Sequence, residues 1–287
     1  MDLCDLRTIR DLLGRHGFHF SKSMGQNFLI DASVPRDIAM SSGADESCGV
    51  LEIGPGIGPL TVQLSRLAGK VAAVVLDRSL LPVLEETLAE CDNVQVISGD
   101  VLKLDLSALV REQFPGLAPL VGANLPYNIT TPVLTALVEA GCFASLTVMI
   151  QREVARRICA APGTADYGAF SVFMQYHTEP QLLFDVPPEC FYPAPKVTSS
   201  VLHCRLRQAP PVETEDPAFF FRVVRAAFAL RRKTLLNSLS SALGGFDKEV
   251  LRQAIADCGL PADIRGERLG LAEFAALTRA LAPHRPQ

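Results

Sequence analysis

The feature that most constrains the fold is a regular alternation of short apolar runs with segments of helical periodicity. We interpret the runs as buried strands, expected at 50–53, 70–77, 93–100, 119–127 and 145–151. Between them, apolar residues recur at helical spacing in segments 59–68, 80–90 and 131–140. Strands that alternate with helices predict a parallel sheet covered by helices on both faces.

The pattern changes after residue 151. A helix is expected at 167–177, and two strands, 181–186 and 199–207, follow closely enough to form an antiparallel edge of the sheet. Segment 208–217 is a linker rich in proline and acidic residues, and the rest of the chain to about residue 282 is helical in pattern. We therefore predict two domains, an α/β domain at 1–210 and a small all-α domain at 211–287.

Composition excludes several classes of protein. The 287 residues include 27 Lys and Arg against 31 Asp and Glu, a net charge of −4 that argues against a uniformly basic nucleic-acid binder. No stretch of 18 apolar residues occurs and the N-terminus is charged, so we expect a cytoplasmic chain without membrane or secretion segments. The eight cysteines are scattered without a CxxC pair, which predicts neither a zinc site nor disulfides.

The average charge hides an asymmetry. Residues 1–150 hold 10 basic and 17 acidic residues, whereas residues 151–287 hold 17 basic and 14 acidic ones. No acid lies between Asp216 and Asp247, but five basic residues do, namely Arg222, Arg225, Arg231, Arg232 and Lys233. This run is either a solvated helix face or a patch that contacts nucleic-acid phosphates.

A glycine-rich loop, Glu52–Gly58 (EIGPGIG), follows the first expected strand. Gly54 and Gly56 would let the backbone approach a ligand closely at the carboxyl end of the sheet. The dinucleotide pattern GxGxxG would need a third glycine where Pro59 stands, and no P-loop lysine follows. The alternatives are a site for another ligand or a turn that binds nothing.

Three further segments carry groups suited to adenine. Asp100, beside Val101 at the end of the third strand, could accept a hydrogen bond from an adenine amine, although Asp is also common as a helix cap. In Asn124-Leu125-Pro126-Tyr127, a side-chain and a backbone carbonyl could accept both N–H groups of an exocyclic amine, Pro126 stiffens the turn, and Tyr127 offers a stacking face. Phe191 begins a proline-rich loop and could stack on a flipped base. Ordinary loops are the alternative for the last two.

Together these residues resemble the ribosomal RNA adenine dimethyltransferase family, in particular its bacterial small-subunit branch. The resemblance extends over nearly the whole chain, from Ser23–Leu29 (SMGQNFL) through the loops above to Phe228–Leu235 (FALRRKTL). It implies a Rossmann-like methyltransferase sheet followed by a small helical domain. It also implies an enzyme that uses S-adenosylmethionine (SAM) to dimethylate N6 of two adjacent adenosines in a 3′-terminal hairpin of small-subunit (16S) rRNA in an assembling 30S particle. Nothing in the sequence indicates an obligate oligomer, so we expect a monomer.

The resemblance also implies roles for individual residues. Asn27 and Leu29 would contact SAM from the N-terminal segment, Gly54 and Gly56 would line its methionine side, and Asp100 with Val101 would bind its adenine. Asn124 would hold the target amine beside the sulfonium, with Tyr127 and Phe191 flanking the base. The basic residues after 218 would grip rRNA phosphates, and no metal is required.

One position departs from the family pattern. The family has Glu at the end of the second strand, two residues before an Asp, and its carboxylate accepts both ribose hydroxyls of SAM. Val75 occupies that position here, and Asp77 lies one step further along the same strand face. Hydrogen bonds to charged groups contribute roughly 1.5–3 kcal/mol each, so we predict weakened SAM binding.

Two other functions remain open. The large-subunit rRNA adenine methyltransferases share the catalytic motifs, although the segments around Gly25–Leu29 and Phe228–Leu235 fit them less well. Alternatively, the chain acts chiefly as a ribosome assembly factor with little methyl transfer, an idea that Val75 strengthens.

Overall fold

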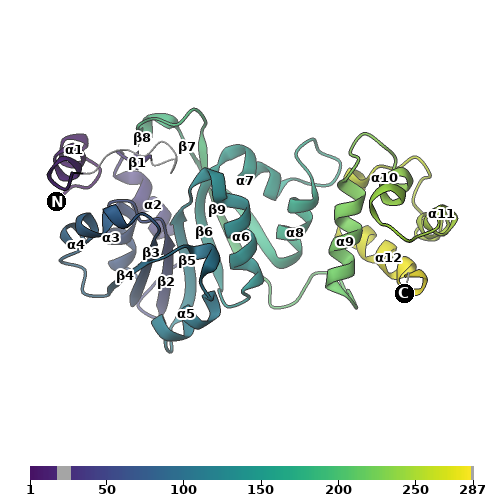
Figure 1. The fold of residues 1–287 in the computed structure, drawn as a ribbon, viewed down its shortest axis with the longest axis horizontal. Coiled ribbons are helices and arrows are strands. Elements are labelled where there is room, and N and C mark those ends of the chain that lie inside the picture. Colours follow the sequence, from purple (N-terminus) through teal and green to yellow (C-terminus); the bar gives the residue numbers. More distant parts are fainter. Residues whose placement is uncertain (18–26, 286–287) are drawn as a thin grey trace. The chain divides into compact units, whose positions relative to one another are not determined.

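The computed structural model describes residues 1–17 and 27–285 (Figure 1). Among these residues a seven-stranded sheet has the order β4-β3-β2-β5-β6-β9-β7. The pairs β2–β3, β3–β4, β2–β5 and β5–β6 are parallel, and β9 lies antiparallel to β6. The strands are β2 (Cys48–Ile53), β3 (Lys70–Val75), β4 (Val94–Ser98), β5 (Ala118–Asn124), β6 (Ser145–Gln151), β7 (Thr178–Val186) and β9 (Ser199–Leu206). The predicted mostly parallel sheet with an antiparallel edge is confirmed.

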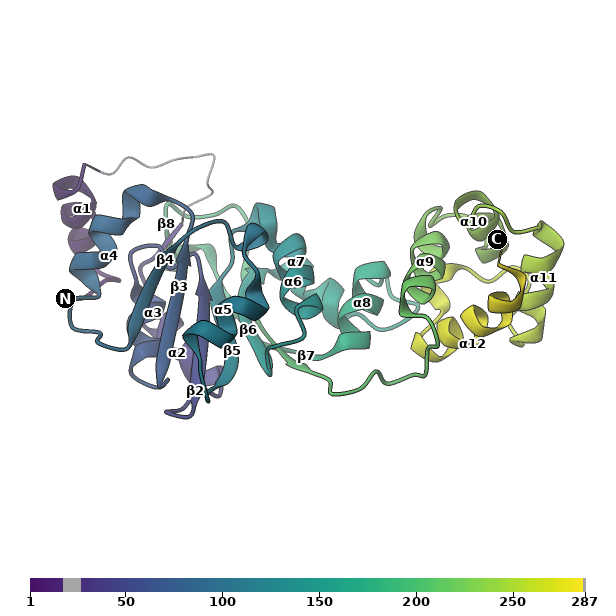
Figure 2. The same cartoon turned by 60° about the horizontal axis from the view of Figure 1, so that its bottom comes forward.

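Helices cover both faces of this sheet (Figures 1 and 2). They are α2 (Ser33–Ser41), α3 (Pro59–Ser65), α4 (Leu81–Thr87), α5 (Leu106–Gln113), α6 (Thr130–Glu139) and α7 (Arg152–Cys159). The close packing of α3 on the sheet depends on Gly122 in β5, where a Cβ atom would lie 3.2 Å from the Leu64 side chain. Strand β2 is buried along its whole length, as expected for a central parallel strand.

A second, two-stranded sheet joins distant parts of the chain. β1 (Phe28–Leu29) pairs antiparallel with β8 (Phe191–Tyr192), so that Leu29 lies opposite Phe191. Ile30 extends the pairing because its N–H donates to the Cys190 carbonyl over 2.8 Å. The N-terminal segment and the loop before β9 are thereby held side by side.

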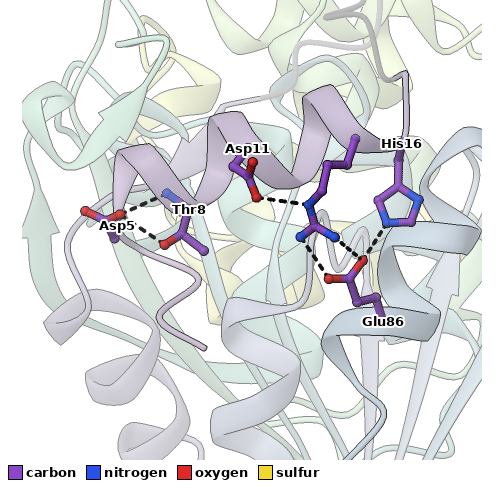
Figure 3. Close-up of polar contacts among 6 residues, drawn as sticks. Asp5, Thr8, Asp11, His16 and Glu86 are labelled. Carbon is purple, nitrogen blue, oxygen red and sulfur yellow. Dashed lines mark hydrogen bonds and ion pairs between the residues drawn. The ribbon is translucent and has the colours of Figure 1, made fainter.

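Helix α1 (Leu6–Arg15) begins at Asp5, whose carboxylate accepts from the Thr8 N–H, and packs beside α4. Its buried residues Ile9, Leu12 and Leu13 join an apolar cluster that also contains Val83 and Leu84 of α4. At its C-terminal end, Arg15 and His16 both contact Glu86, at 2.9 and 2.7 Å (Figure 3). Hydrogen bonds from Arg15, and then from His16, lower the pKa of Glu86. These contacts are partly exposed, so the apolar face contributes most of the docking energy.

The chain divides into two compact units, Met1–Ala155 with Pro180–Leu206, and Arg156–Glu179 with Arg207–Gln287. The second unit contains α8 (Ala169–His177), α9 (Pro217–Phe228), α10 (Leu235–Ala242), α11 (Lys248–Asp257) and α12 (Leu271–Leu281). Its core is strongly aromatic, with Tyr176 packed 5.1 Å from Phe220 between ring centres. This division places segment 156–179 with the helical unit, whereas we expected everything before residue 210 to belong to the sheet domain.

We predict that Gly266→Ala destabilises the helical unit. A Cβ atom at this buried position would lie 2.5 Å from the backbone carbonyl oxygen of Ala227, which cannot move aside as a flexible side chain could. Overpacking of this kind costs about 1–3 kcal/mol, which urea unfolding followed by circular dichroism would detect. Gly244→Ala is the matched control, since nothing lies within 4 Å of its added Cβ. Equal stability of the two variants would contradict the prediction.

Candidate active site

A cavity of about 250 Å³ opens in the first unit, at the carboxyl ends of β2, β3 and β5. This is the position where open α/β sheets bind ligands, because the strand order reverses between β2 and β5. Ten of the predicted site residues line it, namely Asn27, Leu29, Gly54, Gly56, Val75, Asn124, Leu125, Pro126, Tyr127 and Phe191. Ser23–Gln26 of the predicted N-terminal motif lie outside the described residues.

The glycine-rich loop forms one wall of the cavity. Gly54 and Gly56 have φ angles of 71° and 59°, a region of backbone conformation that other residues rarely adopt. Added Cβ atoms would lie 3.8 Å from Pro126 and 3.8 Å from Phe28, respectively, which is ordinary contact. The glycines are therefore required chiefly by the turn of the backbone, and this turn leaves the cavity open.

Glu52 is the most unusual residue of the wall. It is the second-last residue of β2, only 1% of its surface is exposed, and its Oε2 atom has no hydrogen-bond partner among the described residues. Burial raises its pKa to about 8, and the neighbouring Thr61 hydroxyl opposes this shift only in part. An unpartnered buried acid of this kind is costly in a core and is typical of a binding site.

Among the residues that the structure describes, the charged side chains of the wall are all acidic. Glu52 and Asp77 line the cavity, and no Lys, Arg or His is among the described residues that do so. Asp77 is also held in place, because its Oδ1 accepts from the Ser79 N–H and hydroxyl. Such a wall suits a cationic ligand and disfavours a bare phosphate, which would need positive partners.

The segment Asn124–Tyr127 forms the facing wall. The Leu125 N–H donates to the Met149 carbonyl over 3.1 Å, and the Pro126 carbonyl accepts from the Thr130 hydroxyl at 3.2 Å. The Tyr127 hydroxyl shares a 2.6 Å hydrogen bond with Ser199 Oγ, and burial raises the tyrosine pKa. These contacts fix the turn and hold the tyrosine ring in place.

Phe191 reaches the same cavity from β8. Only 3% of its surface is exposed, and its pairing with Leu29 holds it at the wall. The structure thus brings Asn124, Tyr127 and Phe191 together, as the sequence predicts, from two segments 64 residues or more apart in the chain.

Two predicted cofactor residues lie elsewhere. Asp100 and Val101 are not among the residues that line the cavity, although they follow β4 at the same edge of the sheet. The Asp100 carboxylate instead caps a short helix by accepting from the Leu102 N–H at 3.1 Å, and it lies 3.7 Å from Lys103 Nζ. Their contact with adenine stays a prediction.

Val75, the position that departs from the family pattern, is buried in the wall with 2% of its surface exposed. It belongs to an apolar cluster with Phe28, Ile57 and Leu80, which also line the cavity. This part of the wall offers hydrocarbon where the family pattern has a carboxylate, and Asp77 is the nearest acid in sequence.

The five basic residues predicted to bind RNA are all exposed in the second unit. Arg231 is engaged within that unit, since it donates to the Ala165 carbonyl and lies 3.7 Å from Glu267. Arg222 lies 5.8 Å from the centre of the Phe219 ring. The second unit holds 14 basic and 11 acidic residues, so its net charge is +3.

Two further properties concern the part of the chain that the structure describes. No cluster of three or more His, Cys, Asp or Glu side chains there could hold a metal ion. None of its helices is long and apolar enough to cross a membrane.

Along most of its length the chain is similar to known proteins. The family model for ribosomal RNA adenine dimethylase matches residues 17–262. The chain is 47% identical over 286 residues to a ribosomal RNA small subunit methyltransferase A of Geobacillus thermodenitrificans, covering 98% of each chain. It is 46% identical to the protein of the same name from Bacillus cytotoxicus, covering 99% of each.

Solved structures show the same fold. A dimethyladenosine transferase from Plasmodium falciparum superposes with a TM-score of 0.76 at 22% identity, covering 89% of this chain and 97% of that one. A 23S rRNA methyltransferase superposes with a TM-score of 0.66 at 26% identity, covering 89% of this chain and all of the other. The family model covers most of this chain and the curated relatives match it from end to end, so the chain belongs to the ribosomal RNA adenine dimethylase family.

Proposed function

We propose that this protein transfers methyl groups from SAM to N6 of two adjacent adenosines in a 3′-terminal hairpin of small-subunit (16S) rRNA. The observation that carries the proposal is the single cavity that joins the glycine-rich loop to the Asn124–Tyr127 turn and Phe191. A donor held by the loop and a base held by the turn would meet there. The curated relatives at 46–47% identity are named for the small subunit, which favours it over the large subunit.

The residues of the cavity fit SAM on three counts. The positive φ angles of Gly54 and Gly56 leave room for a ligand close to the backbone. The only charged side chains of the described wall are acidic, which suits a ligand with sulfonium and ammonium groups. Phe28, Ile57 and Leu80 offer apolar contact for its remaining surface. When bound, SAM supplies a methyl group already activated by the cationic sulfur, so a metal ion is not needed.

The protein's own contribution would be positioning. The Asn124 side-chain carbonyl and the Leu125 backbone carbonyl accept the two N–H bonds of the adenine amine, which directs the nitrogen lone pair at the methyl group. The hydrogen bond of Tyr127 to Ser199 holds the aromatic ring at the cavity, where it and Phe191 flank the base. The amine loses its proton to water after attack, so no strong general base is required.

The basic residues of the second unit would hold rRNA phosphates outside the cavity. Arg222, Arg225, Arg232 and Lys233 are exposed, and the charge of +3 on their unit supports this role. A role in assembly of the 30S particle, the monomeric state and a cytoplasmic location stay predictions. An assembly factor with little methyl transfer remains the alternative that Val75 favours.

Asn124→Ala should lower the rate of methyl transfer about a hundredfold, because loss of alignment at the reacting atoms has effects of this size. Mass spectrometry of small-subunit rRNA, after incubation of unmethylated subunits with protein and SAM, measures dimethyladenosine directly. Methylation by the unchanged protein of large subunits alone would contradict the proposal. Binding of small subunits without methylation at saturating SAM would support the assembly-factor alternative.

Val75→Glu should strengthen SAM binding about tenfold, since a carboxylate would accept hydrogen bonds from the ribose that Val75 cannot. Isothermal titration calorimetry gives both affinities. Val75→Leu is the matched control, because it changes the side chain but adds no acceptor. An unchanged affinity in the Glu variant would show that this position does not limit SAM binding.

Arg232→Ala should weaken rRNA binding and reduce the slope of log K against log salt concentration by about 1, the change expected for one lost phosphate contact. Filter binding at several salt concentrations measures this slope. Arg252→Ala on α11 is the control, because that arginine pairs with Glu249 within its own helix. The same slope for Arg232→Ala and the unchanged protein would remove Arg232 from the RNA interface.

A further inference from the structure

Helix α1 supports the cavity wall from behind. Its buried residues Ile9, Leu12 and Leu13 pack in the apolar cluster that includes the cavity-lining Phe28 and Ile57. No residue of α1 is itself among the described residues that line the cavity. Any effect of this helix on the reaction therefore passes through the residues that it holds in place.

Arg10 joins this helix to β8. Its guanidinium carbon lies 4.9 Å from the centre of the Tyr192 ring, within the range of about 6 Å over which a cation is attracted to an aromatic face. Its Nη2 atom also donates to the Tyr192 hydroxyl over 3.2 Å. One side chain thus holds the tyrosine by both its ring and its hydroxyl group, and it connects segments 182 residues apart in the chain.

Tyr192 is the neighbour of Phe191 on the outer side of β8. The two residues make up the whole strand, and successive side chains of a strand point to opposite faces. Phe191 is 3% exposed and lines the cavity, whereas Tyr192 is partly exposed and does not line it. A strand of two residues makes few ladder hydrogen bonds, so a contact that fixes Tyr192 from outside also fixes where the Phe191 ring lies.

The C-terminal end of α1 is fixed to α4. Arg15 and His16 both contact Glu86 of that helix, at 2.9 and 2.7 Å (Figure 3). Helix α4 directly follows Leu80, which lines the cavity and packs in one apolar cluster with Val75. Helix α1 therefore bridges the proposed cofactor side of the cavity, which it reaches through α4, and the proposed base side, which it reaches through β8.

We propose that Arg10 is a positioning residue for methyl transfer, which acts through Tyr192 to hold Phe191 against the target base. This inference rests on the proposed function and adds to it a residue that lies outside the cavity. Methyl transfer depends on the alignment of the amine with the methyl group. Loss of the Arg10 contact should therefore slow the reaction of bound substrates and leave the affinity for SAM unchanged.

The experiment measures two quantities on the full chain. One is the single-turnover rate of transfer of the first methyl group to unmethylated small subunits, with SAM and subunits both saturating. The other is the dissociation constant of SAM, from calorimetric titration. Arg10→Ala should lower the rate roughly two- to fivefold, the weight of one exposed cation–aromatic contact, and should change the dissociation constant by less than about twofold.

Three further variants separate the contact from the charge. Arg10→Lys keeps a cation near the ring and should recover most of the rate, whereas Arg10→Met keeps much of the length without the charge and should not. Arg7→Ala is the matched control, because it removes the same charge from an exposed position of the same helix. It should behave as the unchanged protein.

A double-mutant cycle ties the effect to Tyr192. In a Tyr192→Leu background, Arg10→Ala should cause no further loss of rate, because the ring and hydroxyl that Arg10 contacts are absent. Tyr192→Phe keeps the ring and removes the hydroxyl, so its rate should lie between those of the unchanged protein and Tyr192→Leu. Losses of rate that multiply when the Arg10 and Tyr192 changes are combined would overturn the inference.

The failures can be told apart. A full rate in Arg10→Ala, or a loss of rate matched by an equal weakening of SAM binding, would overturn this inference and leave the proposed function intact. Absence of methylation by the unchanged protein would overturn both. Circular dichroism shows whether Arg10→Ala folds, and the comparison of Arg10→Met with Arg10→Lys decides the same question if it does not.

Discussion

The pairing of β2 with β5 is the constraint on which the site depends. Cys48–Leu51 lie in parallel register with Ala118–Val121, so both strands end at the same edge of the sheet. The glycine-rich loop that follows β2 and the Asn124–Tyr127 turn that follows β5 therefore meet. A Cβ atom on Gly54 would lie 3.8 Å from Pro126, which shows how closely the two loops approach. The proposed methyl transfer to a base needs groups from both loops.

In this site, a residue that suits ligand binding can lower the stability of the fold. Glu52 is the second-last residue of β2, a strand that is fully buried, and it is the one charged residue in that strand. A neutral acid there is tolerated, but ionisation without a partner would be costly. Local choices that conflict with core packing are expected at functional sites, where a ligand supplies the missing interaction. Val75 differs from Glu52, because it packs in an apolar cluster but cannot make the polar contact expected of the Glu in the family pattern.

Much of the sheet could be predicted because its central strands β2, β3, β5 and β6 are largely apolar, but the ends of the elements could not. The run 119–127 continues past the strand, which stops at Asn124 because the turn at Pro126 begins there. The β1–β8 pairing joins segments more than 160 residues apart, and no local pattern signals it. The helix at 167–177 was predicted, but its packing partners were not, because the contact of Tyr176 with Phe220 spans the linker. Of the predicted site, Asp100 follows β4 at the expected edge of the sheet but is not among the residues that line the cavity, and its contact with adenine stays a prediction.

The two parts of the chain carry net charges of opposite sign whether the chain is divided at residue 150 or into the two compact units. Moving segment 156–179 to the helical unit still leaves a net charge of −7 on the sheet unit and +3 on the other. The opposite charges of the two units can be explained by the different ligands that the units are proposed to bind. A lysine or arginine in the cavity wall would repel a cationic cofactor. Phosphate contacts, in contrast, need exposed positive side chains that long-range attraction can use. A protein that takes a cationic cofactor and a polyanionic substrate therefore gains by keeping the two kinds of charge on separate units, and the overall charge of −4 is the sum of two opposite requirements.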